Sequence, residues 1–272
     1  MIKKAMFVLP GVFFSALLAA QSLDVTVEEI GGALRITKSG GTARELVIPD
    51  AINGAPVTAI GPGAFAKRGL EKLTIPATVT EIGDLAFADN RLTSLVIGDN
   101  VTVIGRGAFS GNRITDLSLG QGLGSIGRGA FSRNRIAGLT ITGSITAIED
   151  YAFFSNNIRT LSVPGTVAVI GAGAFSGNQI SQLEINQGVT DIGAGAFYNN
   201  QIRSVTIPAS IAVMGERAFD LRTSGASGTV EYRDTGGNLL LSSSGNFDTY
   251  YNISGKRAGT YTLTQEGWQY GN

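Results

Sequence analysis

Residues 107–136 read GAFSGNRITDLSLGQGLGSIGRGAFSRNRI, so the group GAFS-x-NRI occurs twice within one short stretch. The two copies are 22 residues apart. The same interval of 22 residues separates the phenylalanines of eight Ala-Phe pairs, and chance does not produce such regularity. The chain is therefore an array of similar units, marked by Phe65, Phe87, Phe109, Phe131, Phe153, Phe175, Phe197 and Phe219.

Each unit also repeats its apolar positions at fixed offsets. Seven apolar side chains at about 1.5–3 kcal/mol each do not offset the ordering of 22 residues at about 1–2 kcal/mol each. One unit alone does not fold, so neighbouring units must stack and bury each other's faces. A period of this length predicts a leucine-rich-repeat solenoid, a right-handed coil of short parallel β-strands and turns with β-rich caps. In the unit that ends at Phe109, the apolar positions are Leu92, Leu95, Ile97, Val101, Ile104, Ala108 and Phe109.

The run L-x-x-L-x-I, as in residues 70–75, predicts the strand of each unit. Alternation points Leu73 and Ile75 inward and the residues between them outward. The outward residues of all units should tile one continuous sheet, and they are small and polar. Such a surface favours an extended contact with a macromolecule over a pocket for a small substrate. The candidate contact residues on this sheet are Lys72, Thr74, Ser94, Asp116, Gln182 and Glu184.

An asparagine follows the phenylalanine by three residues in six units, from Asn90 to Asn200. A ridge of ligand contacts is one interpretation. Because these asparagines lie beside buried positions, we favour a structural role in which each amide bonds backbone groups of its own turn and of the adjacent coil.

Five arginines occur between residues 106 and 135, with Asp116 as the single acid among them. Arginines that share one offset should stack one coil apart, and a row of cations could bind an acidic protein or glycan. The alternative is a solvated edge without a ligand. The candidates are Arg91, Arg113 and Arg135 in the row, and Arg106, Arg128 and Arg133 beside it.

Composition argues against most other classes of function. The formal net charge is zero, with 21 residues of each sign, which gives no basis for nucleic acid as a partner. The chain has neither histidine nor cysteine, so we expect no metal, no cofactor and no enzymatic activity. Gly122, Gly124 and Gly127 match G-x-G-x-x-G, but they lie outside a βαβ context and are interpreted as turn glycines. The pair Glu149-Asp150 departs from the residues that other units have at the same offsets. It is either a local ligand site or a sequence variation confined to one unit.

The domain prediction has four parts. Residues 1–22 carry Lys3 and Lys4 before an apolar run, which is the layout of a secretory signal peptide; the run is too short and too interrupted for a membrane anchor. Residues 23–56 form an N-terminal cap, 57–222 the array, and 223–272 a β-rich C-terminal cap or tail. If the protein were an enzyme, the tail with Asp248, Tyr250 and Glu266 would hold the site.

The unit LEKLTIPATVTEIGDLAF at residues 70–87 resembles the BspA-like class of bacterial leucine-rich repeats, and the resemblance covers residues 46–219. This chain has asparagine where a cysteine is frequent in that class, and a slightly shorter period. The resemblance implies a protein that is secreted or held at the cell surface or outer envelope, with the periplasm as another possible location. It also implies binding of an extracellular protein or glycan, in adhesion to host matrix, host cells or other bacteria. The alternative is a structural envelope component or spacer without a host ligand, and the sequence does not predict an oligomeric state.

Overall fold

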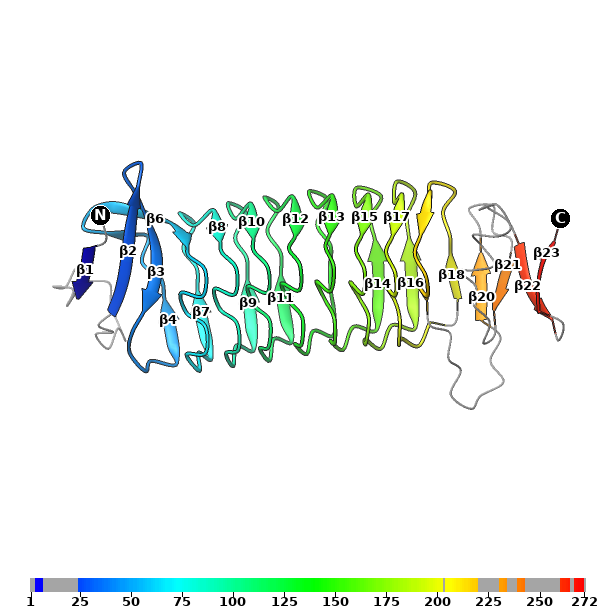
Figure 1. The fold of residues 1–272 in the computed structure, drawn as a ribbon, viewed down its shortest axis with the longest axis horizontal. Helices are drawn as coiled ribbons and strands as arrows, with labels where there is room; N and C mark the ends of the chain where they lie inside the picture. The colour runs from blue at the N-terminus through cyan, green and yellow to red at the C-terminus, as the bar shows by residue number, and fades with distance from the viewer. Residues whose placement is uncertain are drawn as a thin grey trace.

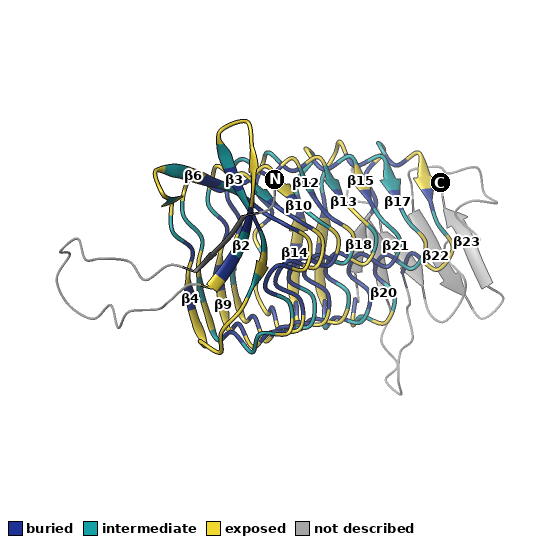
Figure 2. Ribbon diagram, turned by 60° about the vertical axis from the view of Figure 1, so that its left-hand side comes forward, coloured by how far each residue is buried: buried dark blue, intermediate teal, exposed yellow. Residues whose placement is uncertain are grey.

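The molecule is a β-solenoid whose coils follow one another along its long axis (Figure 1). The description rests on a computed structural model. Side chains are described for residues 24–202 and 207–219, and backbone strands alone for 3–6, 204–206, 230–233, 239–242, 260–264 and 267–271. Buried and exposed residues alternate regularly around each coil, as the burial colours show (Figure 2). The predicted repeat solenoid is confirmed.

The L-x-x-L-x-I runs form parallel strands along one side of the solenoid, which we call the first face. Neighbouring strands pair in a register of one coil, so that Asp116 lies beside Ser94 and Leu161 beside Leu183. Outward and inward residues alternate as predicted, with Ser94 and Val96 exposed around buried Leu95. The strands are β4 (Glu45–Val47), β7 (Lys72–Thr74), β9 (Ser94–Val96), β11 (Asp116–Ser118), β14 (Thr160–Val163), β16 (Gln182–Ile185) and β18 (Ser204–Thr206).

The expectation of one continuous sheet is wrong. On the first face, β4 pairs with β7, β9 pairs with β11, and β14, β16 and β18 form a third sheet. The coil between β11 and β14 contributes only an isolated bridge between Gly138 and Thr160. Glycine weakens a strand because it has no side chain to pack and a high conformational entropy to lose, which accounts for the break at this coil.

A second line of strands, each two residues long, runs along the opposite part of the coils. These strands end in the isoleucine or methionine that precedes the turn, and the sequence analysis did not single them out. Their outward positions include the exposed side chains of Val103, Val169 and Val213. The strands of this second face are β8 (Glu81–Ile82), β10 (Val103–Ile104), β12 (Ser125–Ile126), β13 (Ala147–Ile148), β15 (Val169–Ile170), β17 (Asp191–Ile192) and β19 (Val213–Met214).

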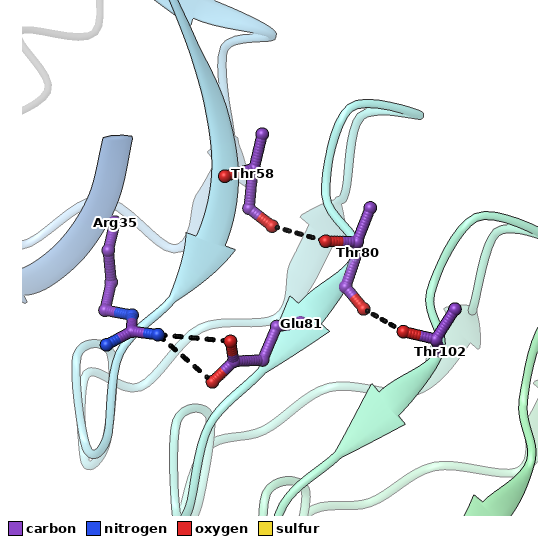
Figure 3. Close-up of polar contacts among 5 residues, drawn as sticks. All are labelled: Arg35, Thr58, Thr80, Glu81 and Thr102. Carbon is purple, nitrogen blue, oxygen red and sulfur yellow. Dashed lines mark hydrogen bonds and ion pairs between the residues drawn. The ribbon is translucent and has the colours of Figure 1, made fainter. Parts of the chain in front are cut away.

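β-strands precede the array. β2 (Asp24–Ile30) and β3 (Ala33–Ser39) form an antiparallel pair, β1 (Lys3–Met6) lies along β2, and β5 (Ala51–Ile52) forms a hairpin with β6 (Ala55–Ile60). Arg35 of β3 reaches Glu81 of β8 at 3.1 Å, while the hydroxyl groups of Thr80 and Thr102 donate to the carbonyl oxygen one coil earlier (Figure 3). These contacts attach the N-terminal strands to the second face.

Strands also follow the array. β20 (Val230–Arg233) continues the first face by pairing in parallel with β18 and is followed by β21 (Leu239–Ser242). β22 (Thr260–Thr264) pairs with β23 (Gly267–Gly271). The cap and array boundaries given above remain predictions.

The interior is a column of phenylalanine rings, one from each coil. Adjacent rings are stacked with centroids 5.2–5.6 Å apart and planes within 12° of parallel. Rings at this separation gain from both burial and favourable offset stacking. The column explains why the Ala-Phe pair recurs without exception.

The asparagines form the predicted ladder of buried amides. Asn134 donates to the carbonyl oxygens of Phe131 in its own coil, at 3.1 Å, and Phe109 in the preceding coil, at 3.0 Å. Its Oδ1 accepts from the backbone N–H of Ile114 at 3.1 Å. The same set of bonds is made by Asn90, Asn112, Asn156, Asn178 and Asn200. The structural interpretation is confirmed.

The glycine motif serves packing between coils. A Cβ at Gly122 would lie 2.0 Å from the carbonyl oxygen of Asp99, and one at Gly127 would lie 2.3 Å from that of Ile104. Leu123 between them is fully buried. Only glycine permits this approach of neighbouring backbones, so Gly122 and Gly127 have a structural role, whereas a Cβ at Gly124 would meet nothing within 4 Å.

Candidate ligand-binding surface

Each coil presents one turn that carries the constant Ala-Phe pair and asparagine, with exposed side chains around them that vary from unit to unit. It runs from three residues before the phenylalanine to four residues after it, between a strand of the second face and the next strand of the first face. We call the stack of these turns the turn edge. Its segments are residues 84–91, 106–113, 128–135, 150–157, 172–179 and 194–201.

The turn edge has two left-handed backbone positions in most coils, two residues before and two residues after the phenylalanine. Glycine occupies many of them, but Leu85, Tyr151 and Arg133 adopt φ values of 56°, 57° and 56°. The left-handed conformation costs a residue with a Cβ about 1–2 kcal/mol. The neighbouring coils hold the backbone in this shape whatever the side chain, so the edge tolerates variation in what it displays.

Arg91, Arg113 and Arg135 form the predicted row. The backbone N–H of Arg113 donates to the carbonyl oxygen of Leu92 at 3.0 Å, and that of Arg135 donates to Ile114 at 3.0 Å. These bonds set successive arginines one coil apart, and all three side chains are exposed. The same bond continues the row through Asn157, Gln179 and Gln201, where amides replace the cations.

Arg106, Arg128 and Arg133 lie on the same turn edge. Arg128 forms an ion pair with Asp150 at 3.1 Å, and its backbone N–H donates to Glu149 at 3.0 Å. In the part of the chain that the structure describes, Arg106, Arg133 and the three arginines of the row form no ion pair. The turn edge therefore concentrates cations over two adjacent coils, residues 106–113 and 128–135, with one additional cation at Arg91.

The candidates of the first face lie beside this row. Thr74, Ser94 and Gln182 are exposed, as are Asp116 and Glu184. The hydroxyl group of Thr115 donates to Asp116 at 2.8 Å, and Ser162 donates to Glu184 at 2.9 Å.

Lys72, the remaining candidate, forms an ion pair with Glu45 of β4 at 2.6 Å. A hydrogen bond from its ammonium to Glu45, together with the charge of that carboxylate, raises the pKa of Lys72 above its ordinary value. Lys72 therefore links β7 to β4 and is less available to a ligand than the arginines are.

Residues 24–202 and 207–219 hold no candidate metal site. This range contains no group of three acidic, histidine or cysteine side chains that could hold a metal ion. Asp150 and Glu149 are occupied by the contacts with Arg128, and Asp150 also accepts from the backbone N–H of Ala172 at 2.8 Å. Asp248, Tyr250 and Glu266 lie outside the described residues. The described part also has no helix with the length and hydrophobicity to cross a bilayer.

The sequence analysis missed a group of aromatic side chains farther along the turn edge. The ring of Tyr151, which is 46% exposed, meets Phe154 edge to face with centroids 5.9 Å apart. Two coils beyond, the guanidinium of Arg217 lies 4.4 Å from the ring centroid of Tyr198. The signal in the sequence is an aromatic residue after the repeat phenylalanine, at positions 154 and 198, where other units have alanine, serine or, at position 220, aspartate.

Comparison with known proteins identifies the family to which the repeat belongs. The model of the BspA type leucine-rich repeat region matches residues 45–159 and 146–227, with six copies. No curated protein matches the sequence.

Solved structures similar to this chain are bacterial leucine-rich repeat proteins. A leucine-rich cell surface protein from Faecalibacterium prausnitzii is 24% identical, with 81% of this chain and 76% of that chain covered and a TM-score of 0.48. A leucine-rich repeat protein from Bacteroides ovatus is 18% identical, with 73% and 67% covered and a TM-score of 0.43. One from T. pallidum is 18% identical, with 70% and 83% covered and a TM-score of 0.42. Because the family model accounts for more than half of its residues, the chain belongs to the BspA type leucine-rich repeat family.

Proposed function

We propose that this protein is an exported, non-enzymatic binding protein that holds an acidic extracellular macromolecule along its turn edge. The observation that carries the proposal is the exposed row of Arg91, Arg113 and Arg135, which has no acidic partner within the described part of the chain. Arg106, Arg128 and Arg133 extend the same positive surface.

The physical argument is charge spacing. Hydrogen-bonded strands lie about 4.8 Å apart, so the backbone positions of the arginines in the row follow one another at about that interval. Like charges at this distance repel, and a solvated edge normally avoids the repulsion by alternating signs, as Lys72 and Glu45 do. A partner with several negative charges removes the repulsion and gains from all of the cations together.

The place of action follows from the N-terminal segment. Residues 1–22 would direct export and be removed, leaving a protein that is secreted or retained at the cell surface or outer envelope. There the array would mediate adhesion to host matrix, host cells or other bacteria. The first face, with Thr74, Ser94, Asp116, Gln182 and Glu184, borders the row and would widen the contact.

The test is binding of the mature chain to heparin, a model polyanion, at low and at high ionic strength. The variant Arg113→Glu/Arg135→Glu should weaken binding at least about tenfold, because reversed charges repel the ligand where they had attracted it. Lys38→Glu, an exposed charge reversal on β3, is the control and should leave the affinity unchanged. Unchanged affinity in the double variant, with an unchanged melting temperature, would refute the arginine site and favour a structural spacer.

A further inference from the structure

We propose that the ligand of the turn edge is an acidic polysaccharide lying parallel to the solenoid axis. This inference rests on the proposed function and specifies its ligand. The edge has two halves: a cationic half, residues 106–113 and 128–135, and an aromatic half, residues 150–157, 172–179 and 194–201 with Arg217. Arg91 lies one coil before the cationic half, in a turn that also carries the exposed Asp84 and Asp89. The acidic groups of the polymer bind the first half, and its sugar rings pack on the second.

The two halves form one surface. The row that begins with Arg113 and Arg135 continues as Asn157, Gln179 and Gln201 through the same backbone hydrogen bond in each coil. A polymer that follows the row therefore passes from guanidinium groups to amide groups. Amides donate and accept hydrogen bonds together, which suits hydroxyl groups better than it suits anions.

Tyr151 provides a ring for stacking. It occupies the left-handed position two residues before Phe153, and its ring lies over the next coil at Gly173, where an added Cβ would be 2.5 Å from Tyr151 Cε1. Phe154 supports the ring from the side with an interplanar angle of 90°. The negative face of an aromatic ring attracts the partly positive C–H groups on the face of a sugar.

Tyr198 and Arg217 provide a second contact in the same direction. The guanidinium carbon of Arg217 lies over the Tyr198 ring, 4.4 Å from its centroid. Neither the hydroxyl group of Tyr151 nor that of Tyr198 has a hydrogen-bond partner among the described residues. These donors and acceptors remain available to the hydroxyl or carboxylate groups of a sugar.

A polysaccharide fits both halves better than an acidic peptide does. An acidic peptide would be held by the arginines, but it has no repeated apolar faces to match Tyr151 and Tyr198. Sugar residues present C–H faces and hydroxyl groups in every unit.

The experiment titrates the full chain with four polymers: heparin, which is sulfated; alginate, which carries carboxylates; neutral dextran; and polyglutamate, an acidic peptide. Heparin or alginate should bind more tightly than dextran and polyglutamate. Whichever of the two binds more tightly identifies the acidic group as sulfate or carboxylate. Replacing Tyr151 and Tyr198 together by alanine should weaken binding of that polysaccharide about tenfold and leave polyglutamate unaffected.

Two controls separate this inference from the proposed function. Replacing the same tyrosines by phenylalanine restores the rings and should recover most of the lost affinity. Val103→Ala/Val169→Ala removes exposed apolar side chains from the second face, outside the proposed contact, and should change nothing. The polysaccharide inference fails if polyglutamate binds as tightly as the polysaccharides and Tyr151→Ala/Tyr198→Ala leaves polysaccharide affinity unchanged. The arginine site would still stand in that case. If Arg113→Glu/Arg135→Glu affects no polymer, the proposed function itself fails.

Discussion

The interior of the solenoid and its turn edge differ in how closely they follow the repeat. In the interior, phenylalanine occupies the same position in every unit, and its rings stack at nearly constant spacing. On the turn edge, one position is Leu85, Gly107 and Tyr151 in different coils, all with the same left-handed backbone. Substitution should therefore be costly inside and mild on the edge, where it should act on binding instead of stability.

The largest effect is expected inside the column. Phe131→Ala removes a fully buried ring that stacks on both Phe109 and Phe153, so it should lower the free energy of unfolding by about 3–5 kcal/mol. Urea unfolding, followed by circular dichroism, measures this loss of unfolding free energy. Phe131→Leu is the control and should lose less, because it keeps a large apolar side chain. A loss below about 1 kcal/mol would contradict the stacked core.

Two adjacent asparagines test the boundary between interior and edge. Asn156→Ala leaves the carbonyl oxygens of Phe131 and Phe153 without their amide donor, so unfolding should become easier by about 1–3 kcal/mol. Asn157 is exposed in the row of the turn edge, and Asn157→Ala should change stability by less than about 0.5 kcal/mol. Equal losses in both variants would remove the distinction.

A left-handed position of the edge should accept glycine with a gain. Leu85 has φ of 56° and is half exposed, so Leu85→Gly should raise stability by about 1 kcal/mol through relief of strain. Gly107→Ala makes the opposite change at the same position of the next coil. It should lower the stability, because the new Cβ would be 2.8 Å from Leu85 Cδ2. A shift in melting temperature of the opposite sign in either variant would show that the coil does not impose this backbone.

The smallest effect concerns pH. The chain has no histidine, and arginine stays protonated far above neutrality. Heparin binding should therefore change less than about twofold between pH 6 and pH 8.5 at fixed ionic strength. A steep dependence in this range would point to a site other than the arginine row.

The sequence predicted what repeats. The interval between phenylalanines determined the solenoid, and the asparagine three residues later determined the ladder, because both are needed once in each coil. The second face was missed because a two-residue strand is too short to give a periodic signal. The break at Gly138 was missed because a single glycine does not alter the average unit.

The candidate site could be predicted only in part from the sequence, for a related reason. The arginine row shares one offset and could be predicted as a stack. Tyr151 and Tyr198 occupy different offsets in different coils, so they appeared as departures from the repeat. Their proximity on one edge depends on the three-dimensional path of the turn, which the linear pattern does not contain.

The asparagine ladder can also form in the order in which the chain is synthesised. Every hydrogen-bond partner of Asn134, namely Phe109, Phe131, Ser132 and Ile114, precedes it in the chain, and the same holds for the other five. A chain that leaves the ribosome or crosses a membrane with its N-terminus first delivers each amide to groups that have already emerged. The array can then assemble coil by coil as the chain emerges, without waiting for its C-terminal end.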